Sequence, residues 1–538
     1  MWAAPFQFSA RARRVLAAGA LGALAHVTVM WCGFFWLDHG DIEQRYALAP
    51  PGEWLQLFQR GFAHTGFYRP LMALSLSVDA LWGTPWVFHA TNLLWHALAT
   101  AAVVGAVEAL GATGTTALLA GILFGVHPVT DLVVGAISYR ADAMIVALIL
   151  AMLIAHVRGR PILAALCLLA AGLCKETALV VAPALLLAVE LGWGKGPWSK
   201  RSPALPVTLV MAETAGWLCA LLLRLRFAPV WRATLPPLSP GDWVGTRLAS
   251  VLKSAAVLTW PVDRFICDAF PVSALGSWRA LGGVAVLGAL GFLAWRRRGP
   301  ALLLAITLAP SLQGIAAPRF WSPHYLYFPL VFVAWLVAER LAAWKRAGLV
   351  AGGLAATCLS LLSLADGRRY LSNETMFTPE VNQNAQCLEA QFYLAEGLRA
   401  RGDFNGAAAA YQAAQATDSR VLAYVDAYAA AQNLGVTRLL QKRPQDAEAA
   451  FLQALQRVSD PADRRYLLIN LGTAAFHAKE YARVLEYLAG EAEQPAPLLD
   501  ALYMSAVALH ELGQDDEALQ MLARARSLDP LPAKMNGP

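Results

Sequence analysis

Long apolar stretches follow one another from about Val15 to Ala365, and each is close to the roughly 20 residues that a helix needs to cross a bilayer. Hydrophobic residues fill 57% of the 538 positions and charged residues 15%, whereas a soluble domain has about 25% charged residues. A wholly soluble fold is therefore excluded, and we expect an all-α, polytopic membrane domain. The eleven expected crossings are residues 15–36, 86–108, 115–136, 141–157, 161–174, 177–192, 204–223, 280–295, 300–317, 325–343 and 347–365.

Two further apolar stretches, 70–84 and 246–261, are short or amphipathic, and we expect them to be re-entrant or interfacial. Basic residues support this arrangement, because Lys and Arg are enriched in cytoplasmic loops. With eleven crossings, the basic residues at 11–14 and at 296–298 lie on the cytoplasmic side. The same count places the N-terminus in the cytoplasm and everything after residue 365 outside it.

The two parts of the chain carry opposite net charge. Residues 1–365 contain 27 Lys and Arg against 15 Asp and Glu, a net charge of +12, and residues 366–538 contain 16 against 22, a net charge of −6. We expect a membrane domain over 1–365, a linker over 366–384 and a separate helical domain over 385–538. The acidic second part disfavours binding to nucleic acid.

The second part contains an internal repeat. Small side chains recur at Ala407, Ala447, Val484 and Ala518, at intervals of 40, 37 and 34 residues, with the apolar spacing of a tetratricopeptide (TPR) repeat around each. We therefore expect an α-solenoid of about four repeats, whose concave surface binds extended peptide. An amphipathic helical bundle without a binding role is the alternative.

Ionisable and phenolic side chains of the membrane part gather, on the expected topology, at its outer face. An ionisable group near the bilayer centre costs about 2.5–3.5 kcal/mol, so such residues usually mark a cavity, a pair or a pathway. The candidate site residues are Asp38, His39, Asp41, Arg69, His89, Arg140, Asp142, Lys175, Glu176, Arg319, His324, Tyr325 and Tyr327.

Two segments suggest specific chemistry. Asp38 and Asp41 precede an amphipathic stretch, 53–58, that would hold them at the membrane surface, where a carboxylate can take a proton from an attacking hydroxyl. A solvated acidic loop is the alternative. Lys175 and Glu176 stand between two short apolar runs, either as a phosphate-binding lysine with an orienting glutamate or as a structural ion pair.

An ordered set of motifs carries a family resemblance. The motifs are Asp38-His39-Gly40-Asp41, Tyr68-Arg69-Pro70-Leu71, Phe88-His89-Ala90-Thr91-Asn92 with His96, Leu123-Phe124-Gly125-Val126-His127-Pro128, Arg140-Ala141-Asp142, Lys175-Glu176 and His324-Tyr325-Leu326-Tyr327-Phe328-Pro329. Together with the repeats, they resemble the transmembrane and tetratricopeptide-repeat O-mannosyltransferases of the type C (GT-C) glycosyltransferase superfamily. The resemblance implies an enzyme that moves a sugar from a polyprenyl-phosphate carrier to Ser or Thr of a protein, on the non-cytoplasmic face and with inversion.

The resemblance also implies roles for the site residues. Asp38 or Asp41 would be the catalytic base, while His39, His89 and Asp41 are compatible with a divalent metal that no spacing demands. The residues expected to bind the donor phosphate are Arg69, Arg140, Lys175, Arg319 and His324. The residues expected to support them or to bind sugar and lipid are His39, His89, Asp142, Glu176, Tyr325 and Tyr327.

The remaining expectations concern the cell and the rival functions. The Ala-rich composition suggests a bacterial branch, with the protein in the inner membrane, the repeats in the periplasm and a sugar that need not be mannose. The repeats would dock the protein acceptor. The rivals are a GT-C transferase that modifies a lipid or glycan, a transporter, which should show polar residues near midplane, and a non-catalytic membrane-anchored scaffold.

Overall fold

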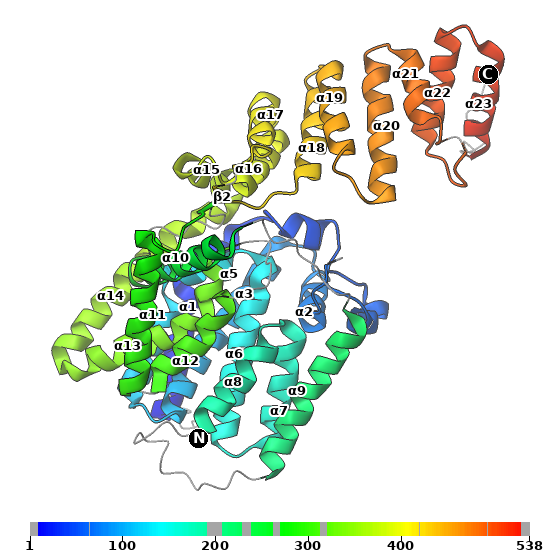
Figure 1. Cartoon of the computed structure of the whole chain (residues 1–538). Helices are drawn as coiled ribbons and strands as arrows, with labels where there is room; N and C mark the ends of the chain where they lie inside the picture. The colour runs from blue at the N-terminus through cyan, green and yellow to red at the C-terminus, as the bar shows by residue number, and fades with distance from the viewer. Residues whose placement is uncertain are drawn as a thin grey trace, which may run out of the picture. The chain divides into compact units, whose positions relative to one another are not determined.

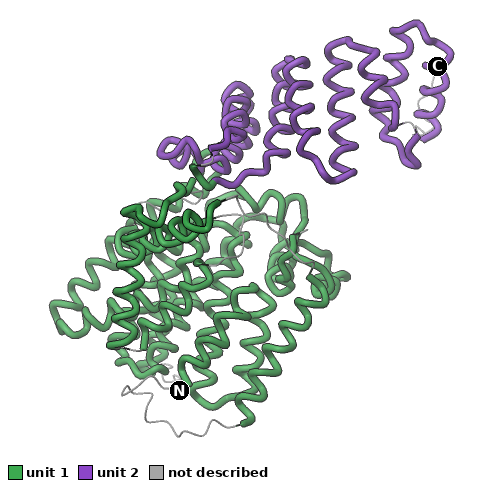
Figure 2. Tube along the Cα trace, in the orientation of Figure 1, with its two compact units in different colours: residues 1–376, 420–422 green, residues 377–419, 423–538 purple. Residues whose placement is uncertain are grey.

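The computed structural model describes residues 9–63, 65–190, 207–228, 238–261, 269–297, 299–312, 320–418, 420–491 and 493–528. The chain divides into two compact units, residues 1–376 with 420–422 and residues 377–419 with 423–538 (Figure 2). Helices make up nearly all the regular structure of the described residues. Two strands of two residues each, β1 (Phe270–Pro271) and β2 (Val421–Leu422), pair antiparallel within the first unit.

The α-helices of the first unit, with the last one crossing its boundary, are shown in Figure 1. They are α1 (Ala10–Ala25), α2 (Pro70–Asp79), α3 (Pro85–Ala109), α4 (Gly114–Gly125), α5 (Asp131–Gly135), α6 (Arg140–Val157), α7 (Pro161–Cys174), α8 (Ala178–Glu190), α9 (Val207–Phe227), α10 (Pro240–Thr259), α11 (Trp278–Arg297), α12 (Gly299–Leu308), α13 (Tyr327–Ala343), α14 (Lys345–Asp366) and α15 (Asn373–Gln383).

Six helical stretches of the described chain are long and apolar enough to cross a membrane, as expected of an integral membrane protein. They contain α3, α6, α9, α11, α13 and α14. A seventh is possible if α4 and the following Pro128–Gly135, bent by 51°, form one span. Shorter apolar helices, α2, α7, α8 and α12 with its extension to Leu312, account for other expected positions, so the count of eleven stays a prediction.

Two segments differ from the sequence expectation. The first crossing was expected over 15–36, but α1 ends at Ala25, because the next residue, His26, is buried and its ring bonds the Gly125 carbonyl and the Asp131 carboxylate. Most of the stretch expected at 246–261 belongs to α10 (Pro240–Thr259), which begins earlier because Ser239 caps it by accepting the Asp242 N–H. α10 is not among the described helices that meet the criteria for a span, and its expected re-entrant or interfacial placement stays a prediction.

The core of the first unit lies around α3, α4, α6 and α13. α6 is 78% buried over its apolar window, whereas α11 is only 17% buried, so the apolar surface of α11 is available to lipid. α1 and α4 approach α3 closely at Gly22 and Gly125, where a Cβ would lie 2.9 and 2.7 Å from atoms of the Thr100 side chain. Small residues at such crossings let membrane helices pack backbone to backbone.

The second unit contains four successive helix pairs (Figure 1). They are α16 (Leu388–Ala400) with α17 (Phe404–Ala413), α18 (Ala427–Leu440) with α19 (Pro444–Leu455), α20 (Pro461–His477) with α21 (Tyr481–Leu488), and α22 (Leu499–Glu511) with α23 (Asp515–Leu528).

The turn inside each helix pair has the same backbone conformation. Gly402, Lys442, Lys479 and Gly513 have positive φ angles of 86°, 59°, 61° and 78°, and each stands five residues before one of the small residues Ala407, Ala447, Val484 and Ala518. These small residues are all buried between the paired helices. The repeat period read from the sequence is thus matched by the turns, while the TPR solenoid itself stays a prediction.

Candidate functional site

The loop after α1 is shaped by a strained residue. Trp36 has a φ angle of 56°, its N–H donates to Asn373 Oδ1 at 2.6 Å, and its buried ring lies 5.4 Å from the Tyr139 ring. Asp38 follows two residues later and precedes a short π-helix, His39–Glu43. The buried tryptophan therefore fixes where the first acidic side chain points.

Asp38 is held by a residue one hundred positions later. Its Oδ1 accepts the backbone N–H of Ser138 at 3.0 Å and the Ser138 hydroxyl at 2.9 Å. Asp38 is 1% exposed, and its Oδ2 is buried with no hydrogen-bond partner among the described residues. Asp41 is half-buried, and its side chain also hydrogen-bonds Ser138.

Both carboxyl groups have a pKa above the ordinary value for aspartate. Burial raises the pKa of Asp38 to about 7, helped by the nearby charge of Asp41 and opposed by the Ser138 hydrogen bonds. Burial likewise raises the pKa of Asp41 to about 6, against the Ser138 hydrogen bond and the positive charge of Arg69. Each group can therefore accept or release a proton near neutral pH, which is the property that a general base needs.

Arg140, at the start of α6, is completely buried, and each of its three nitrogens has a partner. Its guanidinium donates from Nε to Asn92 Oδ1 at 2.6 Å and from Nη2 to the Phe88 carbonyl at 2.9 Å, and its Nη1 lies 2.8 Å from Ser75 Oγ and 2.6 Å from Asp79 Oδ2. These contacts join α2, α3 and α6 below the acidic loop. A phosphate could reach Arg140 only by displacing one of these partners.

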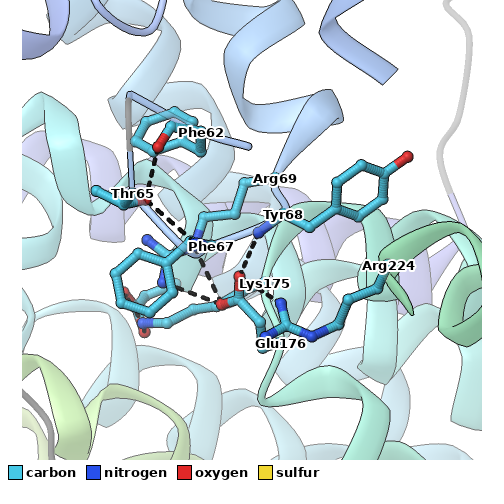
Figure 3. Close-up of polar contacts among 9 residues, drawn as sticks. Phe62, Thr65, Phe67, Tyr68, Arg69, Lys175, Glu176 and Arg224 are labelled. Atoms are coloured by element: carbon cyan, nitrogen blue, oxygen red, sulfur yellow. Dashed lines mark hydrogen bonds and ion pairs between the residues drawn. The ribbon is translucent and has the colours of Figure 1, made fainter. Parts of the chain in front are cut away.

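Glu176 gathers two arginines and a backbone amide (Figure 3). Arg69 donates from Nε and Nη2 to Glu176 Oε2 at 3.2 and 3.1 Å, and Arg224 Nη1 lies 3.1 Å from Oε1. The Tyr68 N–H donates to the same Oε1 at 2.8 Å, while the Arg69 guanidinium lies 4.2 Å from the Phe67 ring centroid. The loop before α2, the α7–α8 turn and the end of α9 thus meet at one carboxylate.

Lys175 points away from its neighbour Glu176. Its backbone is extended, with φ −159° and ψ 141°, so consecutive side chains point to opposite sides. The Lys175 ammonium donates to both oxygens of Asp142 at 2.6 and 2.7 Å. Asp142 therefore pairs with Lys175 and not with Arg140, and Glu176 pairs with arginines and not with Lys175.

The Tyr-Leu-Tyr segment contributes one aromatic row and one core residue. The His324 ring lies 4.3 Å from the Tyr139 ring and 4.2 Å from the Tyr325 ring, and its Nδ1 is 2.8 Å from Ser322 Oγ. Tyr327 is fully buried, and its hydroxyl lies 2.8 Å from His96 Nδ1. Tyr327 is thus a core residue, whereas His324 borders the loop that carries the acids.

The residues suggested for a metal are not brought together. His39 is on the surface and its Nδ1 lies 2.5 Å from Glu43, while His89 is buried and bonds the Gly33 carbonyl at 3.3 Å. Nowhere in the described ranges do three His, Cys, Asp or Glu side chains form a group that could hold a metal ion. Arg319, expected to bind phosphate, lies outside the described residues.

A small pocket lies beside Arg69. It is lined by Tyr46, Ala47, Leu57, Arg60, Gly61, Phe62, Ala63, Arg69, Pro70 and Ala73. Two guanidinium groups and aromatic rings at its wall suit the anionic group of a ligand.

Sequence reasoning missed three partners in this site: Ser138, Asp79 and Arg224. Arg224 and Arg226 in the last turn of an apolar helix were a visible signal, because a charge there needs a partner or a water-filled surrounding. Ser138 gave no signal beyond its place two residues before Arg140. Its role depends on a contact across one hundred residues.

Comparison with known proteins gives partial matches, and no family model matches the chain. The chain is 33% identical over 137 residues to protein O-mannosyl-transferase tmtc2 of Xenopus laevis, which covers 24% of the chain and 16% of that protein. It is 33% identical over 184 residues to protein O-mannosyl-transferase Tmtc2 of Drosophila melanogaster, covering 30% and 20%, and 30% identical over 137 residues to TMTC2 of Homo sapiens, covering 24% and 16%. The predicted resemblance is confirmed. Each match spans no more than a fifth of the relative's length, so the activity of the whole relative is not thereby established for this chain.

Proposed function

We propose that the protein is a membrane glycosyltransferase that moves a hexose from a polyprenyl-phosphate-linked donor to Ser or Thr of a protein on the non-cytoplasmic face. One observation carries the proposal. The carboxyl groups of Asp38 and Asp41 both hydrogen-bond Ser138 and lie near positively charged side chains, and burial raises the pKa of each toward neutral pH. The names of the matched relatives, protein O-mannosyl-transferases, support the same activity.

Asp41 is the better placed of the two acids to meet an acceptor. Asp41 is half-buried, whereas Asp38 is enclosed and bonded twice by Ser138. We therefore assign Asp41 as the base and Asp38 as the group that positions Ser138. The acceptor hydroxyl gives its proton to Asp41, its oxygen bonds the anomeric carbon, and the bond from that carbon to the phosphate oxygen breaks on the opposite side, which inverts the carbon.

The departing phosphate takes the electron pair and gains negative charge, which fixed cations stabilise. Arg69 and Lys175 are the proposed contacts of this phosphate, because both carry a positive charge and their side chains are partly exposed, at 14% and 11%. Glu176 and Asp142 orient these two cations. His324 is proposed to contribute to phosphate binding as well, and Tyr325 to line the sugar or lipid. The same role is proposed for Arg319, which lies outside the described residues.

Arg140 has a positioning role in this scheme. It is enclosed and each of its three nitrogens has a partner, so it acts on Asp38 through its charge, which favours the ionised form of that carboxyl. His89 lies near this charge and supports the loop by bonding Gly33. His39 stays at the surface with Glu43.

The second unit is proposed to bind the acceptor polypeptide. Stacked helix pairs of this kind commonly hold extended peptide, and tethered binding raises the local concentration of the acceptor. We further propose a bacterial inner-membrane location with the N-terminus in the cytoplasm and the repeats in the periplasm. The opposite charges of the two parts and the basic loops support that orientation.

The test uses the purified full chain in proteoliposomes with polyprenyl-phosphate carrying radiolabelled mannose or glucose. Two acceptors are offered together, a Thr-containing peptide and a glycolipid extract. Label in the peptide is the expected result. Label confined to the glycolipid would establish the lipid- or glycan-modifying alternative, and no transfer from either donor would favour a non-catalytic scaffold.

A further inference from the structure

Arg247 on α10 is a buried cation with an incomplete set of partners. The residue is 7% exposed, and its guanidinium lies 3.9 Å from the Phe320 ring centroid and 5.5 Å from the Trp243 ring centroid. Its Nη1 donates to the Phe320 carbonyl at 3.1 Å, while its Nε is buried and has no hydrogen-bond partner in the described part of the chain. No carboxylate of the described residues lies within ion-pair distance of it.

This arrangement contrasts with the other cations of the site. Arg69 pairs with Glu176, Arg140 with Asp79, and Lys175 with Asp142. A guanidinium does not lose its proton in a protein, so a buried one normally has an anionic partner. The two aromatic faces offset only part of the desolvation cost of the guanidinium, which leaves binding of an anion favoured.

Arg247 adjoins the candidate site through an aromatic row. Its helix, α10, packs against the short helix Pro323–Leu326, which carries His324 and Tyr325. The Tyr325 ring contacts that of His324, and His324 in turn contacts Tyr139. Tyr139 directly follows Ser138, which bonds Asp38. These contacts connect the helix of Arg247 with the loop that carries the acidic pair.

A second cation lies on the same helix. The Lys253 ammonium is 5.3 Å from the ring centroid of Trp321, next along the chain from the Phe320 under Arg247. Two consecutive aromatic residues thus each support one cation of α10. Positive charge over aromatic surface suits an amphiphilic ligand with a phosphate at one end and an apolar chain at the other.

We infer that Arg247 binds the phosphate group of a lipid-linked substrate, a contact that neither the sequence motifs nor the matched relatives assign. A planar guanidinium with free donors fits two phosphate oxygens at once. The identity of that lipid as the sugar donor rests on the proposed function. In that reaction Arg247 stabilises the negative charge that develops on the departing phosphate.

The test measures binding of farnesyl phosphate to the purified full chain in detergent by isothermal titration calorimetry. Arg247→Gln is expected to weaken binding by about 10- to 100-fold, the loss of a hydrogen bond between charged groups. Arg279→Gln is the matched control, because Arg279 is exposed on α11 and stacks at 5.3 Å on Trp278; it should bind as the wild type does. Arg247→Lys keeps the positive charge but lacks the planar guanidinium with its several donors, and should give an intermediate affinity.

Each outcome decides the inference. Unchanged affinity in Arg247→Gln overturns it, as does an equal loss in the Arg279→Gln control. Inorganic phosphate, titrated separately, distinguishes the source: if it binds as tightly as farnesyl phosphate, the ligand is free phosphate and the lipid assignment is wrong. If Arg247→Gln does not fold, Arg247→Lys decides, with wild-type affinity counting against the inference. Arg247-dependent binding without sugar transfer would retain the anion site and reject the proposed reaction.

Discussion

Replacing Ser138 by alanine tests how the two acids are tuned. The change removes the hydroxyl that donates to Asp38 Oδ1 at 2.9 Å and leaves the backbone N–H bond at 3.0 Å in place. A hydrogen bond to a charged group contributes about 1.5–3 kcal/mol, and one pKa unit corresponds to about 1.4 kcal/mol. The pKa of Asp38, about 7 in the wild type, should therefore rise by about 1–2 units. Asp41 should shift in the same direction because it loses the same hydroxyl.

The assay is the pH dependence of kcat/KM for sugar transfer to a peptide. The base must be ionised, so the rate of the wild type should rise with pH through about 6–7. In Ser138→Ala this rise should move to higher pH, with most of the rate recovered in alkaline buffer, and Ser138→Thr should restore the wild-type profile. A profile that keeps its midpoint while the rate falls equally at every pH would refute the reasoning, since it would indicate a purely structural role.

Two further pairs of substitutions test the stability of the protein, one pair in each unit. Glu176→Gln leaves two arginines without their carboxylate and should lower the stability of the full chain by about 2–3 kcal/mol, whereas Glu43→Gln, in an exposed pair with His39, should change it by less than about 0.5 kcal/mol; equal melting temperatures for the two variants would contradict this. Lys442→Gly relieves a φ angle of 59° in the second helix pair and should stabilise the protein by about 0.5–1 kcal/mol, while Gly402→Ala at φ 86° should destabilise it by a similar amount in chemical denaturation.

The helix positions followed well from hydropathy because membrane crossing demands a minimum apolar length. The expected spans at 86–108 and 347–365 lie inside α3 (Pro85–Ala109) and α14 (Lys345–Asp366), and each end agrees to within two residues. The end of the first helix was misplaced because the buried contact between His26 and Asp131, at 3.1 Å, is invisible to hydropathy. Apolar composition continues past Ala25, while the backbone turns away.

The site residues were found more easily than their partners. Asp38, Arg69, Lys175 and the other charged candidates stood out because charge is rare in an apolar sequence. Their pairing was not predictable, since Lys175 and Glu176 are adjacent in sequence but point to different partners. An extended residue at the end of α7 decides that, and only the backbone angles reveal it.

The role of Arg247 could not be predicted from the sequence. In the sequence it is one cation in an amphipathic stretch, with no feature that separates it from Lys253. Its ring contacts are with Trp243, on the same helix, and with Phe320. The second contact depends on packing between α10 and a segment more than seventy residues later. Sequence pattern therefore located the acids, whereas the structure was needed to find a cation without a partner.

The most direct test of Asp41-dependent sugar transfer is intact mass spectrometry of secreted and membrane proteins co-expressed with this chain. Wild type and Glu43→Gln, which alters a neighbouring exposed acid, should both add the mass of one or more hexoses to Ser- or Thr-containing acceptors. Asp41→Asn should lose this addition while reaching the same level in the membrane. Hexose addition that persists in Asp41→Asn at the wild-type level would contradict the account.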